Sequence, residues 1–227
     1  IGTKADISEW YNVKLNYSKN YRVPTFNDLY WYAGGNVNLK AETVQQYEIT
    51  NEFQYKAFQF QVAGYYNDFQ NLLKWSPNES GNWTPENVEN VKSYGAEFSL
   101  NFKQNFKAFQ IESTTNYSYT KSVDEKTQKQ LIYVPYHKFT SNWNFNYHRV
   151  SFNYQMVFNG AVFTSSDNSF FLKEHTVSNV SLYYLFGKQK NIILSVSANN
   201  LENRYYENLP SRPMPGRNYT TSLIFNL

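Results

Sequence analysis

Side chains that could carry out acid–base or metal chemistry are few in this chain of 227 residues and lie far apart. The histidines, His137, His148 and His175, fall in three different predicted connections and lack the spacing of a metal site. Glu48 and Glu52 lie on one face of a predicted strand, and we interpret them as solvated side chains of that face rather than as an acid–base pair. The sequence has no cysteine, P-loop or Ser-His-Asp order. We therefore expect no catalysis, no metal site and no resident cofactor.

The composition is marked by its aromatic content. With 21 Tyr, 18 Phe and 5 Trp, aromatic residues make up 19% of the chain. Mean hydropathy is −0.66, and no apolar run approaches the roughly 18 residues of a transmembrane helix. The net charge is +3 and the basic residues are scattered, so we expect no nucleic-acid partner. The chain begins Ile-Gly-Thr-Lys, and we expect it to start within a longer protein.

Apolar and polar residues alternate along most of the chain. In ten segments every second residue forms an apolar row that contains no Asp, Glu, Lys or Arg. Period two over this many segments predicts an all-β protein. The predicted strands cover residues 11–17, 47–55, 58–66, 94–102, 109–119, 139–147, 150–158, 180–186, 192–198 and 219–227.

The predicted connections alternate between short and long. The short ones lie near residues 55–56, 103–107, 147–149 and 187–190, and the long ones near 21–43, 75–90, 121–137, 164–175 and 202–217. Strands of about nine to eleven residues suit a tilted membrane strand. Tyrosines gather at the ends of the apolar rows, as in the two aromatic girdles of a membrane barrel. These features together favour a transmembrane antiparallel β-barrel.

Three other classes compete with this interpretation. A soluble carbohydrate-binding β-sandwich would place tyrosines in the strand middles. An enzyme barrel, such as an outer-membrane protease or phospholipase, would need a Ser/His/Asp constellation at its rim. A passive porin would lack ordered sequence blocks in its long connections.

Five blocks of the sequence do carry such order. They are NYRVPTFNDLYWYAGGNVNLKAETVQQYE (20–48), NVENVKSYGAE (87–97), YVPYHK (133–138), NNLENRYY (199–206) and RPMPGRN (212–218). In this order they make the chain resemble the C-terminal half of a TonB-dependent outer-membrane receptor, nearest to the vitamin B12 and siderophore branches. The family often has Pro where Val37 and Ala41 stand, and an aromatic residue where Glu202 stands.

The resemblance implies a barrel of about 22 strands with a plug domain in its lumen. Residues 1–227 would then be the C-terminal part of that barrel, about ten strands, with the plug and the N-terminal strands absent. It further implies the bacterial outer membrane and TonB-driven import of an iron-siderophore, haem or cobalamin. The expected partners are the plug and N-terminal barrel part, membrane lipid and lipopolysaccharide, TonB through the plug, and a surface lipoprotein. The C-terminal row ending at Leu227 is similar to the signal of the barrel assembly machinery, which usually ends in Phe.

The long connections are where the resemblance places ligand binding. They carry aromatic side chains that could stack on a flat ligand and arginines that could meet an anionic one. The candidate ligand-binding residues are Tyr30, Trp31, Tyr32, Trp75, Trp83, Phe170, Phe171, Tyr205, Tyr206, Arg212 and Arg217.

Overall fold

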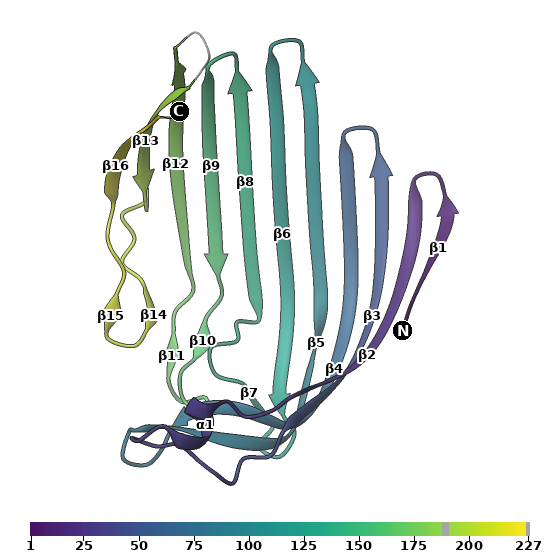
Figure 1. The fold of residues 1–227 in the computed structure, drawn as a ribbon, viewed down its shortest axis with the longest axis vertical. Coiled ribbons are helices and arrows are strands. Elements are labelled where there is room, and N and C mark those ends of the chain that lie inside the picture. Colours follow the sequence, from purple (N-terminus) through teal and green to yellow (C-terminus); the bar gives the residue numbers. More distant parts are fainter. Residues whose placement is uncertain (188–190, 226–227) are drawn as a thin grey trace.

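One antiparallel sheet makes up most of the computed structural model, which describes residues 1–187 and 191–225 (Figure 1). Its strands are β1 (Gly2–Ser8), β2 (Tyr11–Arg22), β3 (Glu42–Tyr55), β4 (Phe58–Pro77), β5 (Trp83–Phe106), β6 (Phe109–Asp124), β7 (Lys129–Gln130), β8 (His137–Tyr147), β9 (Val150–Asn159), β12 (His175–Phe186), β13 (Ile192–Asn199) and β16 (Asn218–Phe225). Eleven of them pair in chain order from β1 to β16, and the short β7 pairs with β6. The all-β prediction is confirmed.

Smaller elements lie in the long connections. They are the helix α1 (Phe26–Tyr30), the hairpin of β10 (Val162–Phe163) with β11 (Phe171–Leu172), and the hairpin of β14 (Glu207–Leu209) with β15 (Arg212–Pro213). We call the end of the sheet that bears these elements the mouth. Within residues 1–187 and 191–225, no helix has the length and apolar character needed to cross a membrane.

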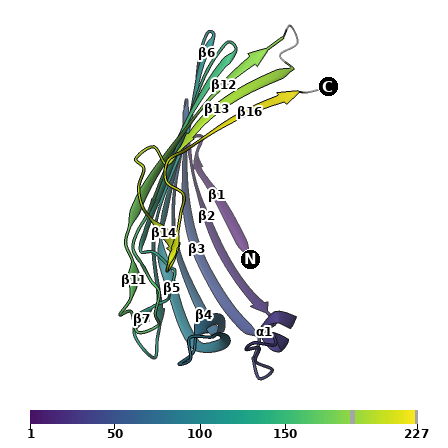
Figure 2. The ribbon, with the colours of Figure 1, turned by 90° about the vertical axis from the view of Figure 1, so that its left-hand side faces the viewer.

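The predicted apolar rows form the outer face of the sheet. Leu15, Ile49, Leu182, Val196 and Leu223 remain 45–54% exposed. A sandwich would cover such side chains with a second sheet, but here the sheet is a single curved layer (Figure 2). The apolar face is therefore free to meet lipid.

Tyrosines line the outer face near the mouth. Tyr17, Tyr47, Tyr66 and Tyr94 stand opposite one another on β2 to β5. The centroids of successive rings lie 5.1, 6.3 and 6.5 Å apart. Phenols at one level on neighbouring strands form the aromatic belt expected at a membrane–water boundary.

The strands differ from the prediction in number and length. The sequence rows missed β1, whose outward residues Thr3 and Ala5, opposite Leu15 and Val13, make a weak apolar row. Strands β4, β5 and β6 have 20, 24 and 16 residues, well beyond the predicted lengths. Residues 75–90 are therefore no long loop, because β4 and β5 continue their pairing to Pro77 and Trp83.

The short connections are tight turns. Lys56, Lys107 and His148 each adopt a left-handed backbone, with φ of 52°, in the β3–β4, β5–β6 and β8–β9 turns. Tight hairpin turns need positive φ, which these residues supply without glycine. Of the predicted turn at 187–190, residues 188–190 lie outside the described residues, as do residues 226–227 at the predicted C-terminal signal.

The inner, concave face is polar, and the aromatic side chain of Tyr65 lies across it. Tyr65 stands opposite Gly95, and its hydroxyl bonds the Thr120 hydroxyl at 2.7 Å. A Cβ at Gly95 would lie 1.9 Å from the Tyr119 carbonyl oxygen and 2.8 Å from the Tyr65 hydroxyl. Glycine thus lets the phenol ring cross the wall instead of projecting into the lumen.

Buried apolar side chains gather where the long β4–β5 hairpin bends. Val91 is fully buried, and Leu73 and Val88 are nearly so. The pairing skips Asn71, which has a φ of 56°. Figure 2 shows the mouth end of this hairpin curving to the concave side, where α1 lies.

Candidate functional site

The helix α1 is fixed over the mouth by a buried carboxylate. Thr25 and Asp28 form a capping box, with Asp28 accepting from the Thr25 N–H and hydroxyl, both at 2.8 Å. The indole N–H of Trp75 donates to the other oxygen of Asp28 at 2.8 Å, which links α1 to β4. Burial alone would raise the pKa of Asp28, but these hydrogen bonds and the charge of Arg22 lower it. Asp28 is therefore ionised, and both of its carboxylate oxygens accept hydrogen bonds that hold α1 against β4.

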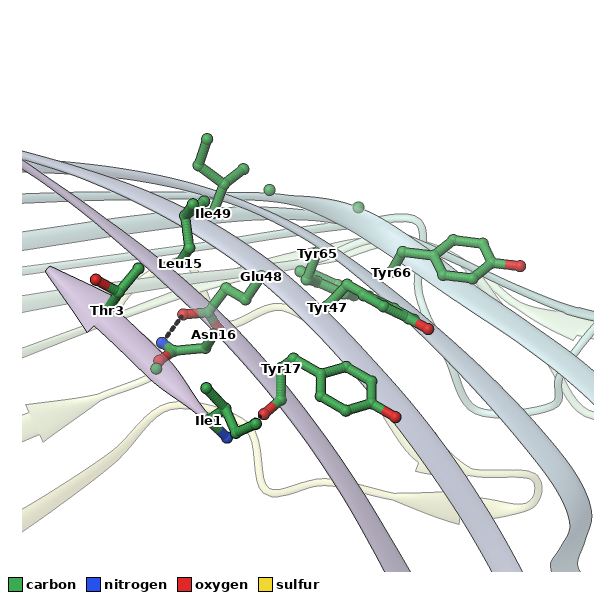
Figure 3. Close-up of a pocket in the computed structure, with 13 residues that line it drawn as sticks. Ile1, Thr3, Leu15, Asn16, Tyr17, Tyr47, Glu48, Ile49, Tyr65 and Tyr66 are labelled. Carbon is green, nitrogen blue, oxygen red and sulfur yellow. Dashed lines mark hydrogen bonds between the residues drawn. The ribbon is translucent and has the colours of Figure 1, made fainter.

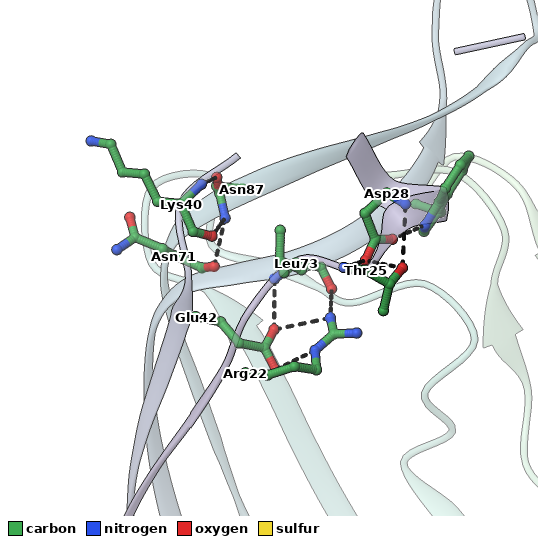
Figure 4. A network of polar contacts seen from close by, with 9 residues as sticks. Arg22, Thr25, Asp28, Lys40, Glu42, Asn71, Leu73 and Asn87 are labelled. Carbon is green, nitrogen blue, oxygen red and sulfur yellow. Dashed lines mark hydrogen bonds and ion pairs between the residues drawn. The ribbon is translucent and has the colours of Figure 1, made fainter. Parts of the chain in front are cut away.

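A second set of bonds ties both ends of the α1 segment to the hairpin (Figure 4). Arg22 donates to the two oxygens of Glu42 at 2.9 and 3.2 Å and to the Leu73 carbonyl oxygen at 3.2 Å. The Leu73 N–H donates to Glu42 at 2.8 Å. Asn87 bonds Lys40 through both backbone groups, at 2.8 and 3.0 Å. We call these contacts of Arg22, Asp28 and Glu42 the clamp; all three residues belong to the first sequence block.

The clamp holds an exposed aromatic group, which we call the α1 platform: Tyr30, Trp31 and Tyr32. These side chains are 64%, 46% and 92% exposed. The rings of Trp31 and Tyr32 lie 5.3 Å apart, and Tyr30 packs at 5.9 Å against Phe26. Exposed aromatic rings at the mouth can stack on a flat ligand.

Two further candidates on the β4–β5 hairpin have structural contacts. Trp75 lies on β4 rather than in a loop, and its N–H is bound to Asp28. Trp83 opens β5 and is 44% exposed, and its ring lies 6.4 Å from the Tyr133 ring in a tilted arrangement. Trp83 thus joins the hairpin to the β6–β8 connection.

The remaining candidates lie at the C-terminal side of the mouth. Phe170 and Phe171 are exposed at the β10–β11 hairpin, and Tyr206 stacks on His175 at 4.5 Å. Tyr205 is exposed and donates to Glu207 at 2.6 Å. The structure therefore divides the candidates between two sides of the mouth.

The two arginines of this side differ in their surroundings. Arg212 is exposed on β15. Arg217 donates to the Leu201 carbonyl oxygen, and its N–H donates to Asn203 at 2.8 Å. Arg217 thus anchors the last loop, while ligand contact by either arginine stays a prediction.

The fourth sequence block is also a clamp. Asn200 is buried, and its side chain bonds the Arg204 N–H and carbonyl oxygen and the Pro215 carbonyl oxygen, at 2.8–3.1 Å. Glu202, where an aromatic residue was expected, accepts from the Ser178 N–H at 2.9 Å. The departure from the pattern thus supplies a bond between the loop and β12.

Sequence reasoning missed the links between neighbouring loops. The buried Gln130 exchanges two bonds with Asn168, at 2.9 and 3.0 Å, which joins the β6–β8 connection to the β10–β11 hairpin. In that hairpin, hydrogen bonds from the Ser165 hydroxyl and from Ser169 lower the pKa of Asp167 to about 2. A single Gln or Asp in a loop belongs to no periodic pattern or motif, so the sequence alone could not predict these contacts.

A hollow of about 710 Å³ lies beside the tyrosine belt near the β1 edge (Figure 3). Tyr17, Tyr47 and Tyr66 line it, and Gly64 leaves room between them and Ile49. Because these side chains belong to the outer apolar rows, this hollow faces the lipid side and not the mouth.

No group of three or more potential metal ligands occurs within residues 1–187 and 191–225.

Comparison with known proteins decides the family. Residues 4–201 match the family model described as TonB dependent receptor-like, beta-barrel. The chain belongs to this TonB-dependent receptor family. The resemblance inferred from the five blocks is thereby confirmed. TonB-dependent receptors are β-barrels of the Gram-negative outer membrane, and the chain is part of such a barrel.

Relatives and solved structures agree with this assignment. The vitamin B12 transporter BtuB of Photobacterium profundum is 27% identical over 190 residues, which cover 81% of this chain and 30% of that protein. BtuB of Vibrio vulnificus is 37% identical over 84 residues, 37% of this chain and 14% of that protein. The chain thus spans about a third or less of these relatives.

Solved TonB-dependent receptors share the fold. The copper transporter OprC superposes with a TM-score of 0.81 at 14% sequence identity. The match covers 100% of this chain and 39% of the OprC chain. A ferric enterobactin receptor of Pseudomonas aeruginosa superposes with a TM-score of 0.77 at 17% sequence identity. The match covers 99% of this chain and 39% of the receptor chain.

Proposed function

We propose that this chain forms wall, lumen lining and extracellular mouth of a receptor that imports a large, scarce nutrient with energy supplied through TonB. Family membership and the outward apolar face of the single-layer sheet support the barrel role. The observation that carries the ligand role is the α1 platform, which buried polar bonds hold at the mouth.

The physical argument follows from what such a barrel can do. A large nutrient does not diffuse through small pores, and the outer membrane holds no ion gradient to drive its uptake. Tight binding outside must therefore be followed by work delivered from the inner membrane. In this proposal the plug and the other barrel strands lie beyond this chain, and TonB acts on the plug. The protein binds and releases its cargo without catalysis.

The proposed cargo is an iron-siderophore, a haem or a cobalamin. The relatives are named for vitamin B12 transport and the solved structures for ferric enterobactin and copper. Stacking aromatic side chains suit the flat faces of a corrin, a porphyrin or a catecholate ring. The plug, membrane lipid and lipopolysaccharide, and a surface lipoprotein are the proposed partners.

The test is binding and uptake by the intact receptor in cells with and without TonB. Replacing Tyr30, Trp31 and Tyr32 together by Ala should weaken nutrient binding by at least about tenfold, a loss of about 1.4 kcal/mol. Tyr55→Ala is the matched control, because Tyr55 is also 64% exposed but lies at the opposite end of β3. Uptake that persists without TonB would contradict the proposal and favour a passive porin.

A further inference from the structure

Three short turns, at the end of the sheet away from the mouth, each carry a cation (Figure 1). Lys56 lies in the β3–β4 turn, Lys107 in the β5–β6 turn and Arg149 in the β8–β9 turn. Strand pairing continues up to each turn, so the cations stand at the tips of two-residue connections. The Arg149 guanidinium donates to the Leu185 and Gly187 carbonyl oxygens at 3.4 and 3.0 Å, which leaves its charge in place. We call these three residues the rim cations.

An exposed aromatic residue ends the strand before each rim cation. These residues are Tyr55, Phe106 and Tyr147, and each is more than half exposed. Tyr55 and Tyr147 belong to the outward apolar rows, and Phe106 shares the face of Phe102 because residues four apart on a strand point the same way. The ammonium of Lys56 lies 5.1 Å from the centroid of the Tyr55 ring. Cation and lipid-facing ring therefore occur together, as at the boundary between headgroups and acyl chains.

The charge of this part of the rim has one sign. The hairpin ends 55–58, 106–109 and 147–150 contain no Asp or Glu. Within residues 1–187 and 191–225, none of the rim cations takes part in an ion pair. The mouth differs, because its β6–β8 connection has Asp124 and Glu125 beside Lys126 and Lys129. The rim from β3 to β9 therefore presents a positive surface that the chain itself does not neutralise.

The carboxylates nearest to the two lysines along the chain are engaged elsewhere. Glu52 pairs with Lys14 at 2.6 Å, and Glu112 pairs with Lys103 at 2.5 Å. Both glutamates alternate with residues of the outward rows, so they lie on the concave face. The rim cations are thus left to meet an anion from outside the chain.

We propose that the rim cations bind the phosphate groups of anionic phospholipids, such as phosphatidylglycerol, in the periplasmic leaflet of the outer membrane. This inference rests on the proposed function, in which the mouth faces outside and the short turns face the periplasm. Successive turns lie two strand spacings apart, about 10 Å, so each cation meets its own headgroup. The exposed rings on the lipid side favour a membrane headgroup over an acidic protein as the partner.

The test measures the lipid selectivity of the intact receptor in phosphatidylcholine vesicles. Spin-labelled phosphatidylglycerol and spin-labelled phosphatidylcholine are the probes, and electron paramagnetic resonance gives the fraction of each held at the protein surface. A rim cation should raise affinity for the anionic lipid about fivefold at its own site, and the other lipid sites dilute this effect. We expect an overall preference for phosphatidylglycerol of about twofold at low salt, which 1 M salt weakens.

Two matched variants locate the preference. Lys56→Gln/Lys107→Gln should remove about half of it or more, because two of the three cations are lost. Both lysines are exposed, and glutamine keeps most of their length, so the turns should still form. Lys126→Gln/Lys129→Gln removes the same charge from exposed positions at the mouth and should leave the preference unchanged. Heat-modifiable migration on a gel verifies that both variants form folded barrels.

Three results would overturn the inference. They are equal retention of the two lipids by the unchanged receptor, a preference that the rim variant retains in full, and an equal loss in both variants, which would trace the preference to overall charge. TonB-dependent nutrient uptake in cells separates this failure from that of the proposed function. Normal uptake together with any of the three results would remove the lipid site and leave the receptor function standing.

Discussion

At the scale of single residues, the charged residues of the first sequence block hold the loops, and the aromatic residues beside them are the proposed ligand contacts. Arg22 donates to Glu42, and Glu42 and Asp28 accept hydrogen bonds from the β4–β5 hairpin. The exposed side chains of the α1 platform sit between them. The sequence could therefore indicate the scaffold from its motif and name candidate ligand residues from their aromatic type, whereas their exposure follows only from the structure.

Asp28 gives a direct test of the clamp. Asp28→Ala leaves the Trp75 N–H and the Thr25 donors without an acceptor, at a cost of about 1–3 kcal/mol for each buried group. The backbone amides of Gly35 and Asn36, bonded at 2.7 and 2.8 Å, should then exchange hydrogen roughly tenfold faster or more. Mass spectrometry of the 23–41 segment measures this. Glu79→Gln, at the exposed hairpin tip, is the control, and equal exchange in both variants would refute this role of Asp28.

The lowered pKa of Asp28 also predicts a pH dependence. A carboxylate with a depressed pKa stabilises the fold above its unfolded pKa, and this contribution is lost as pH falls through the folded pKa. Exchange in the 23–41 segment, corrected for intrinsic rate, should stay slow at the ordinary aspartate pKa of about 3.9 and rise only below it. A rise centred on that ordinary value would mean that the hydrogen bonds to Asp28 contribute little.

At the scale of elements, a glycine and a tyrosine show how the wall keeps its lumen clear. Gly95→Ala would press a methyl group against the Tyr119 backbone and displace Tyr65. We expect fewer folded barrels and a lower heat-modification temperature for this variant. Gly64→Ala is the matched control, because its Cβ would meet only Ile49, at an ordinary 3.7 Å. Equal melting of the two variants would show that the flat packing of Tyr65 is dispensable.

The elements could be predicted wherever one face is apolar. The ten rows gave ten real strands because lipid, unlike a mixed core, tolerates no charge on that face. The rows failed at β1, whose outward residues Thr3 and Ala5 are scarcely apolar. They also failed between residues 66 and 94, where β4 and β5 continue beyond the tyrosine belt and remain paired as far as Pro77 and Trp83. The turns at Lys56 and His148 contain no glycine, and the ends of the apolar rows placed them correctly where local turn chemistry gave no signal.

At the scale of the whole molecule, eleven consecutive strands form an open sheet, half of the roughly 22 that the family implies. The outer strands β1 and β16 therefore carry unpaired edges in this chain. A soluble domain would need to cover the apolar face, yet only Ala63, Leu73, Val88 and Val91 are buried hydrophobic residues within the described part. Both features fit a wall segment whose neighbours are lipid and other strands.

The most direct test of the account is the environment of the two faces in a reconstituted bilayer. Spin labels at Phe60, Leu100 and Phe152 of the intact receptor should collide with lipid-soluble oxygen and be protected from a water-soluble nickel chelate. Labels one residue further along, at Gln61, Asn101 and Asn153, should show much less oxygen contact, because the period of a strand turns them to the lumen. Equal oxygen contact on both faces, or shielding of the first set from oxygen, would contradict the assignment of the apolar face to lipid.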